Sequence, residues 1–420
     1  MDNKKKQAYT EILREELKTA MGCTEPIALA YCAAYAKKLL GRMPEACDVY
    51  CSVNIIKNVK AVTVPQTGGM KGIEVAVLAG LVGGDAEKQL EVLTTVREED
   101  RAEIRSLLQS GLVHIHVLDS THLLHIVTEL KAGEETVSVE IIDGHTNLGD
   151  VIHNGQTLHT RQELEIRRSH LRYDLLNIRD ILDYADTVDL KEVSELLGSQ
   201  IQKNSSIAKE GLAHDWGAAV GKTLLCCEGS GTWTRAKAMA AAGSDARMNG
   251  CAMPVVINSG SGNQGLTVSL PVAVYAQDNN VSRERLLRAL CVSNLVAIRQ
   301  KREIGKLSAF CGAVCAAIGA VTGIAYLEGA SYQVISQTII NAIVSIGGMM
   351  CDGAKSSCAG KIASALDCAF LGYELARKGH GYRDGEGLVK ANVEQTIESV
   401  GAVARNGMRS TDQEILRIMV

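Results

Sequence analysis

The stretch LSAFCGAVCAAIGAVTGIAYL, residues 307–327, carries no charged residue and is rich in alanine and glycine. It is long enough for a helix that crosses a lipid bilayer. However, it contains Ser308 and Thr322, lacks an aromatic belt, and lacks a strong basic flank on one side. We therefore predict a buried core helix rather than a membrane-spanning one, and we expect no association with a membrane.

The segments around this stretch share its composition. From about residue 190 onward the chain consists of apolar, helix-like segments rich in alanine and glycine, separated by glycine-containing loops. Earlier in the chain, three segments have the composition of strands, namely residues 113–118, 122–130 and 136–142. We therefore predict an α+β fold, with an N-terminal α/β domain over residues 1–188 and a mostly α-helical catalytic domain over residues 189–420.

The remaining N-terminal segments are mostly helical by pattern. A helix over residues 4–39 is predicted to be interrupted at Gly22–Pro26, because proline restricts the residue before it and often marks a helix start. The other expected elements are strands within 48–65, a loop over Gln66–Gly72, a helix near Ile73–Val82, a surface helix over 85–110 and a charged helix over 160–186.

Charge and cysteine content restrict the class of protein. The net charge is −4, which offers no electrostatic basis for binding nucleic acid. The first twenty residues are charged throughout and lack the apolar region of a secretory signal, so we expect a cytoplasmic protein. In that compartment the 13 cysteines are poor candidates for disulfides, which favours metal-binding or catalytic roles.

Four cysteines in the last third of the chain could bind a metal. Cys311 and Cys315 lie four residues apart, on one face if their segment is helical, and Cys351 and Cys358 lie in the glycine-containing stretch MMCDGAKSSC. A free cysteine can also be a small core hydrophobe, and the spacing alone does not decide between these roles. The Cys351–Cys358 spacing is not standard for zinc, although a four-cysteine zinc site that includes Cys315 remains an alternative.

Two glycine-rich loops are candidates for binding an anion. GSGNQG (260–265) matches the letters of the dinucleotide fingerprint, but Pro271 falls where the following helix should run and the region does not resemble a βαβ unit. Its backbone amides and polar side chains are suited to a carboxylate. TGGMKG (67–72) precedes a helix and offers amides and Lys71. We expect both loops to face one cleft, although either could be a simple tight turn.

The GCTEP turn, residues 22–26, places a thiol at the start of a helix. Thr24 can cap a helix whose first turn contains Glu25 and Pro26, so that Cys23 lies just before the helix N-terminus. The dipole of a helix lowers the pKa of a thiol at this position. Cys23 is therefore expected to be a reactive thiol, the alternative being a small buried residue at a tight turn.

Several of these motifs together resemble the L-cysteine desulfidase family. They are GCTEPIALA (22–30), VNIIKN (53–58), TGGMKG (67–72), AGSDARM (242–248), GSGNQG (260–265) and CDGAKSSC (351–358). The resemblance extends over essentially the whole chain and implies a relative of the iron–sulfur L-serine dehydratases. It implies a 4Fe–4S cluster on Cys311, Cys351 and Cys358, with the fourth iron open to substrate. It also implies that Cys23 is catalytic. From the GCTEP turn and the two glycine loops, we expect the substrate-binding residues to be Thr24, Glu25, Thr67, Lys71, Ser261, Asn263 and Gln264.

The implied reaction is the elimination of sulfide from L-cysteine, giving pyruvate and ammonia. An open iron can act as a Lewis acid, and Cys23 as a thiolate could remove the Cα proton. The expected partner is a small amino-acid substrate, and the expected assembly is a homodimer. Three alternatives remain. They are an iron–sulfur L-serine dehydratase-like deaminase, a pyridoxal-phosphate lyase with Lys71 as the nearest Schiff-base candidate, and a non-catalytic amino-acid-binding protein.

Overall fold

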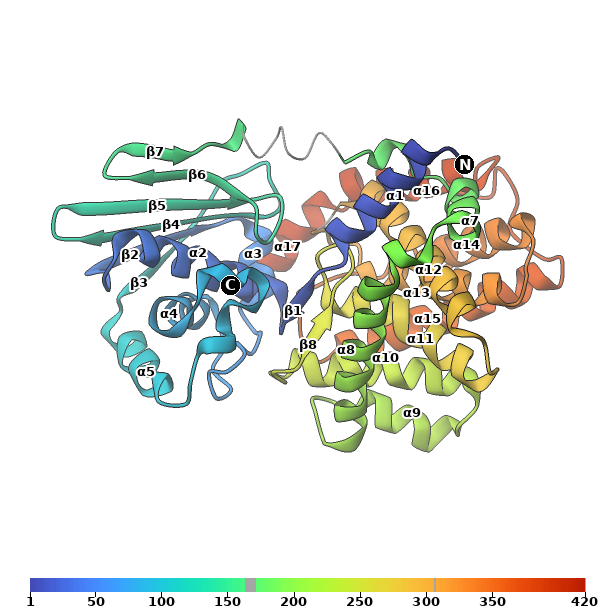
Figure 1. The fold of residues 1–420 in the computed structure, drawn as a ribbon, viewed down its shortest axis with the longest axis horizontal. Helices are drawn as coiled ribbons and strands as arrows, with labels where there is room; N and C mark the ends of the chain where they lie inside the picture. Colours follow the sequence, from blue (N-terminus) through green and yellow to red (C-terminus); the bar gives the residue numbers. More distant parts are fainter. Residues whose placement is uncertain (163–170, 306, 420) are drawn as a thin grey trace.

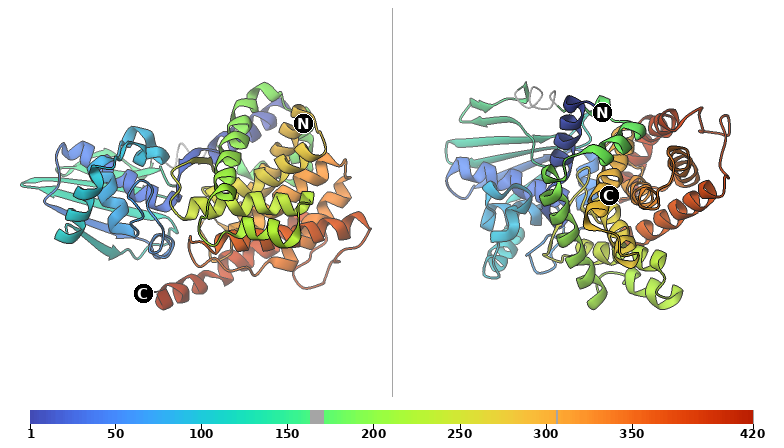
Figure 2. Two further views of the ribbon diagram at one scale, coloured as in Figure 1. Left: turned by 90° about the horizontal axis from the view of Figure 1, so that it is seen from below. Right: turned by 45° about the vertical axis from the view of Figure 1, so that its right-hand side comes forward.

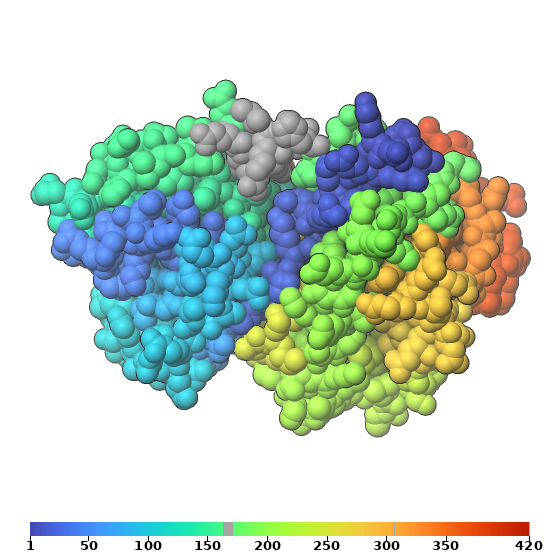
Figure 3. All heavy atoms as spheres, viewed as in Figure 1, coloured from blue at the N-terminus to red at the C-terminus, as the bar shows by residue number. Residues whose placement is uncertain are grey.

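The computed structural model describes residues 1–162, 171–305 and 307–419, and it has the predicted α+β fold. Figure 1 shows two lobes side by side. We call residues 22–159 the sheet lobe, and residues 171–408 together with the first helix the helical lobe. In the space-filling view a notch separates the two lobes along the lower edge of the molecule (Figure 3).

The sheet lobe contains one six-stranded mixed sheet with the strand order β3-β2-β4-β5-β6-β7. β2 and β3 are parallel, and the other neighbouring strands are antiparallel. The strands are β2 (Ala46–Cys51), β3 (Val113–Val117), β4 (His125–Ala132), β5 (Glu135–Ile142), β6 (Leu148–His153) and β7 (Gln156–His159). Helices α2 (Thr24–Leu40) and α4 (Ile73–Gly83) pack against each other, and α2 covers one face of the sheet at β4 and β5.

The predicted elements of this lobe are partly confirmed. The three predicted strands correspond to β3, β4 and β5, and the helix near Ile73–Val82 is α4. The strand prediction over 48–65 is wrong beyond Cys51, because Ser52 starts the helix α3 (Val53–Val59). Strands β6 and β7 were not predicted. β7 is an exposed edge strand, and β6 beside it shows only a short alternating pattern.

The two charged segments are divided differently from the prediction. Residues 85–110 form the 3-10 helix η1 (Ala86–Thr95) and the helix α5 (Asp100–Ser110), with a break between them. The predicted helix over 160–186 includes residues 163–170, which lie outside the described residues. Its later part is not continuous, because η2 (Tyr173–Leu175) and α7 (Ile178–Thr187) are separated by Leu176 and Asn177.

The helical lobe is built around α13 (Gly312–Leu327), which lies within the stretch predicted to be a buried helix. Nearly every residue of α13 is buried, and the helix packs against its neighbours α11, α12, α14 and α15. Within the described ranges, no helix combines the length and the apolar character needed to cross a membrane. Besides α1, η2 and α7, the described part of this lobe contains η3 (Leu190–Glu192), α8 (Ser194–Ala213), α9 (Val220–Glu228), α10 (Thr232–Met248), α11 (Gly262–Asp278), α12 (Arg283–Ile304), α14 (Tyr332–Ile346), α15 (Cys358–Arg377), α16 (Val393–Ala402) and η4 (Val403–Gly407).

Segments from the two ends of the chain join the lobes. α1 (Asn3–Glu16) packs on the helical lobe, where Figure 1 places the N-terminus. The next segment, β1 (Thr19–Met21), pairs antiparallel with β8 (Pro254–Val256). α17 (Arg409–Met419) extends from the helical lobe toward the sheet lobe and packs against α3 (Figure 2). The boundary between the lobes is therefore built from residues hundreds of positions apart.

Candidate active site

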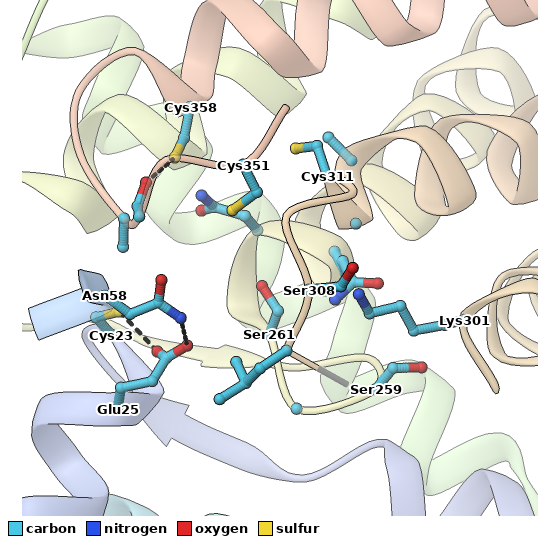
Figure 4. A pocket seen from close by; sticks show the side chains of 18 of the residues that line it. Cys23, Glu25, Asn58, Ser259, Ser261, Lys301, Ser308, Cys311, Cys351 and Cys358 are labelled. Atoms are coloured by element: carbon cyan, nitrogen blue, oxygen red, sulfur yellow. Dashed lines mark hydrogen bonds between the residues drawn. The ribbon is translucent and has the colours of Figure 1, made fainter. Parts of the chain in front are cut away.

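A cavity of about 100 Å³ lies where the two lobes meet. The sheet lobe contributes the start of α2, the end of α3 and the loop before β6, and the helical lobe contributes the rest (Figure 4). The polar or thiol side chains that line it are Cys23, Glu25, Asn58, His145, Arg247, Ser259, Ser261, Asn263, Gln264, Lys301, Ser308, Cys311, Cys351 and Cys358.

Three of the predicted thiols line one side of this cavity. Cys311 is the N-cap residue of α13, Cys351 lies in the loop before α15, and Cys358 is the first residue of α15. The backbone holds two of these segments together, because the amide of Cys351 donates to the carbonyl of Ala309 at 2.6 Å. Cys315 lies one turn further along α13, fully buried, and does not line the cavity.

The environments of these thiols differ. A hydrogen bond from Cys311 lowers the pKa of the Cys351 thiol to about 6, although burial opposes the change. The same hydrogen bond, together with burial, raises the pKa of Cys311 well above its ordinary value. Burial also raises the pKa of Cys358. The shifts therefore favour the thiolate form at Cys351 over Cys311, and thiolate is the form that binds metal.

Cys23 faces the thiols from the opposite lobe. Gly22 before it has a φ of +68°, and a Cβ there would lie 2.2 Å from Cγ of Pro65, so the turn requires glycine. Cys23 is the N-cap residue of α2 and is buried. Its Sγ donates a hydrogen bond to Oε2 of Glu25 at 3.1 Å.

The expectation of a lowered thiol pKa at Cys23 is wrong for this structure. Burial raises its pKa well above the ordinary value, and the negative charge of Glu25 adds to the increase. These effects outweigh the helix dipole, which contributes only about 1 kcal/mol or less at a helix end. For Glu25, burial alone would raise the carboxyl pKa. The neighbouring His145 and the hydrogen bond from Cys23 instead bring it below the ordinary value. The resting pair is therefore a thiol and a carboxylate.

Two further contacts fix this pair in place. Asn58 Nδ2 donates to Oε1 of Glu25 at 3.1 Å, and the Thr24 hydroxyl donates to the carbonyl of Gly260 at 2.8 Å. The second bond ties the start of α2 to the GSGNQG loop of the other lobe. Thr24 itself does not line the cavity, whereas Glu25 does.

The GSGNQG loop enters the cavity as the start of α11. Ser261, Asn263 and Gln264 all line it, and Nη1 of Arg247 donates to Oδ1 of Asn263 at 3.1 Å. Pro271 lies inside α11, which follows a three-residue strand in a two-stranded antiparallel sheet. This arrangement lacks the parallel βαβ unit that a dinucleotide fingerprint requires.

The TGGMKG loop does not reach the cavity, so the expectation that both glycine loops face one cleft is wrong. The Thr67 hydroxyl is buried and donates to the carbonyl of Val64 at 2.8 Å, and Lys71 is exposed. Neither residue lines the cavity. The glycines of this loop form a local turn, as at Gly68, whose φ is +72°.

Six polar residues that line the cavity had no predicted role, namely Asn58, His145, Arg247, Ser259, Lys301 and Ser308. Asn58 and Arg247 lie within the motifs VNIIKN and AGSDARM, which provided a signal but no role. His145 and Lys301 lie in segments with ordinary charged or polar composition. They line the cavity together with residues that are distant in sequence, so the local sequence does not reveal their position.

The comparison with protein families defines the class of this chain. Residues 87–417 match the family model of the serine dehydratase alpha chain. Among similar proteins, the UPF0597 protein of Lachnoclostridium phytofermentans is 50% identical over 410 residues, which are 98% of each chain. The UPF0597 protein of Desulfitobacterium hafniense is 46% identical over 99% of this chain and 96% of its own. The UPF0597 protein of Treponema denticola is 44% identical over 100% of this chain and 99% of its own.

This chain therefore belongs to the UPF0597 family, which is related to the serine dehydratase alpha chain. The relation indicates a lyase-type enzyme.

Proposed function

We propose that the chain is an L-cysteine desulfidase that eliminates sulfide from L-cysteine with the help of a 4Fe–4S cluster. One observation carries the proposal. Three thiols from the helical lobe and a thiol–carboxylate pair from the sheet lobe line opposite sides of the same cavity (Figure 4). The relation to the serine dehydratase alpha chain supports a lyase, and relatives in the serine dehydratase alpha family use iron–sulfur clusters.

The donor set fits an iron–sulfur cluster better than a single metal ion. Within the described ranges, no three histidine, cysteine, aspartate or glutamate side chains approach closely enough to share one ion. A cluster binds each cysteine through a different iron, so its thiolates stand further apart than those around one zinc ion. Cys311, Cys351 and Cys358 would hold the cluster, and the exclusion of Cys315 from the cavity disfavours the four-cysteine zinc alternative.

When bound, the cluster supplies a Lewis-acidic iron that polarises the substrate. The chain's own residues handle the proton. Glu25 is ionised and accepts the hydrogen bond of the Cys23 thiol. The thiol proton can therefore pass to Glu25 in the same step in which the sulfur takes the Cα proton and the carbon–sulfur bond breaks, so that no free thiolate is needed in the resting site. Aminoacrylate then leaves and hydrolyses to pyruvate and ammonia.

L-Serine is the second candidate substrate, because the matching family model is that of the serine dehydratase alpha chain. The same residues could remove its Cα proton, with hydroxide rather than sulfide as the leaving group. A pyridoxal-phosphate mechanism based on Lys71 has no support, since Lys71 lies outside the cavity.

The test begins with anaerobic purification. We expect about four irons and four acid-labile sulfides per chain. L-cysteine should yield sulfide and pyruvate at a higher kcat/KM than L-serine yields pyruvate. A higher kcat/KM for L-serine would assign the enzyme to the dehydratases. A protein that releases neither product would leave only an amino-acid-binding role.

The Cys23→Ala variant tests the proton transfer separately. It should keep its iron and its visible absorbance while losing turnover and the exchange of the Cα proton with deuterium from solvent. Cys32→Ala is the matched control, because Cys32 is a buried thiol on the same helix that does not line the cavity. Exchange at the wild-type rate in Cys23→Ala would remove this thiol from the mechanism.

A further inference from the structure

Lys301 is a buried cation without an ionic partner in the described part of the chain. It lies in the last turn of α12, is 3% exposed, and forms no hydrogen bond or ion pair through its amino group there. Figure 4 shows the amino group directed into the cavity beside Ser308. Burying a charged group without compensation is costly, so such a group is usually paired or serves a function.

The other buried cations show how unusual this is. The buried lysine and arginine side chains among the described residues are Lys57, Lys237, Arg247, Arg299 and Lys301. Lys57 pairs with Asp412, Lys237 with Glu228 and Asp367, and Arg299 with Glu303, Glu394 and Glu398. Only Arg247 and Lys301 lack an ion pair among these, and both line the cavity. The buried cations that form no ion pair among the described residues are thus concentrated at one place.

Hydrogen-bond acceptors without donors lie in the same cavity. Among the described residues, Oδ1 of Asn58 and Oε1 of Gln264 are buried and have no hydrogen-bond partner. Glu25 adds a carboxylate on the same wall as Asn58. A ligand that pairs with these groups needs an anionic group for Lys301 and Arg247. It also needs a cationic group with several N–H donors for the acceptor oxygens. An α-amino acid zwitterion carries both groups on adjacent atoms.

Lys301 also lies between this cavity and a second one. A second cavity of about 690 Å³ adjoins the first, and Lys301, Ser259 and Leu307 line both. Arg247 lines only the inner cavity. Its Nη1 donates to Asn263, whereas its buried Nε has no hydrogen-bond partner among the described residues. Of the two buried cations that line the inner cavity, only Lys301 also lines the outer one.

We propose that Lys301 binds the α-carboxylate of the substrate, while Glu25, Asn58 and Gln264 accept hydrogen bonds from its α-ammonium group. This inference rests on the proposed function, and it names an anchor that places the Cα proton and the leaving group between the Cys23–Glu25 pair and the three thiols. The competing role for Lys301 is to balance the negative charge of the thiolates that would hold the cluster. The hydrogen bond from Cys311 is the largest cause of the lowered pKa of Cys351, and the charge of Lys301 is a smaller one.

The test compares L-cysteine with cysteamine, which has the same thiol and amino groups but no carboxylate. Binding is measured by calorimetry on metal-free protein, where no turnover occurs. Lys301→Met should weaken L-cysteine binding by about 30-fold or more, as expected for deleting one partner of a buried charge pair. It should leave cysteamine binding unchanged. Lys301→Gln should behave in the same way and serves as the second variant if the methionine variant folds poorly.

Arg302→Met is the matched control, because Arg302 is the next residue on α12 and lines only the outer cavity. It should leave both affinities near wild type. Equal weakening of both ligands by Lys301→Met, or unchanged L-cysteine binding, would overturn the proposal. Loss of iron from the anaerobically purified variant with intact L-cysteine binding would establish the counter-charge role instead. If wild-type protein binds L-cysteine through Lys301 but releases no sulfide, the proposed reaction fails and the carboxylate site stands.

Discussion

The buried ion pair between Lys57 and Asp412 should control both the stability of the lobe boundary and the retention of the cluster. Lys57 comes from α3 of the sheet lobe and Asp412 from α17 at the C-terminus, and their side chains are only 1% and 8% exposed. Asp412 Oδ2 also accepts a hydrogen bond from the amide of Ala309 at 3.1 Å, and Lys57 Nζ donates to the carbonyl of Cys351 at 3.4 Å. The pair therefore contacts the segment before Cys311 and the segment that contains Cys351.

The size of the effect follows from burial. Removing one partner leaves the other as an uncompensated buried charge, which costs about 3–5 kcal/mol in the free energy of unfolding. Lys57→Met and Asp412→Leu should each destabilise the protein by that amount. Replacing both by apolar side chains should recover most of the loss, since a well-packed apolar pair is often as stable as a buried ion pair. A surface pair costs much less to break, with a median of about 0–1 kcal/mol.

The assay is urea unfolding of the metal-free protein at neutral pH, followed by iron analysis of the anaerobically purified variants. Arg417→Met is the control on the same helix, because Arg417 pairs with Glu414 at the surface and both are more than half exposed. Each single variant at Lys57 or Asp412 should lose iron as well as stability, since Ala309 and Cys351 lose a contact. Single variants that unfold within about 1 kcal/mol of wild type would refute the reasoning, because a buried charge cannot be left unpaired at so low a cost.

Three further predictions follow from single contacts. Cys311→Ser should abolish iron binding in anaerobically purified protein, whereas Cys315→Ser should retain it, because only Cys311 lines the cavity. Comparable iron loss in both variants would contradict that assignment. Hydrogen bonds from His125 and Arg161 outweigh burial and lower the pKa of Glu140 from 4.5 to about 2. The folded-state pKa is depressed, so this group stabilises the fold at neutral pH by up to about 3 kcal/mol. That stability is lost as the pH falls from about 5 to about 2. Glu140→Gln should remove this loss from the acid-unfolding curve, and an unchanged curve would argue against it. Gly265→Ala should lower the free energy of unfolding by about 1–3 kcal/mol in urea titrations, because a Cβ there would lie 2.0 Å from the carbonyl oxygen of Val256. Wild-type stability would show that α11 can shift freely.

The motifs identified in the sequence account for much of the cavity, but not for its electrostatics. Cys23, Glu25, the GSGNQG loop and the Cys351–Cys358 segment were all candidates, and all line the cavity. The TGGMKG loop had an equally good pattern and lies elsewhere. A glycine-rich turn before a helix looks the same whether its amides face a ligand or solvent, because the pattern records only backbone conformation.

Sequence alone determined the features that depend on neighbours along the chain. The uncharged alanine- and glycine-rich stretch became the buried helix α13, and the alternating segments became β3, β4 and β5. Tertiary structure decided what depends on distant neighbours. The pKa of Cys23 rises because burial and Glu25 outweigh a helix dipole that was predictable locally. Lys301 acquires its role because the folded chain buries it without an acid to pair with. Hydrophobic periodicity and turns depend on a few consecutive residues. Desolvation and charge pairing arise only when segments that are hundreds of residues apart come into contact.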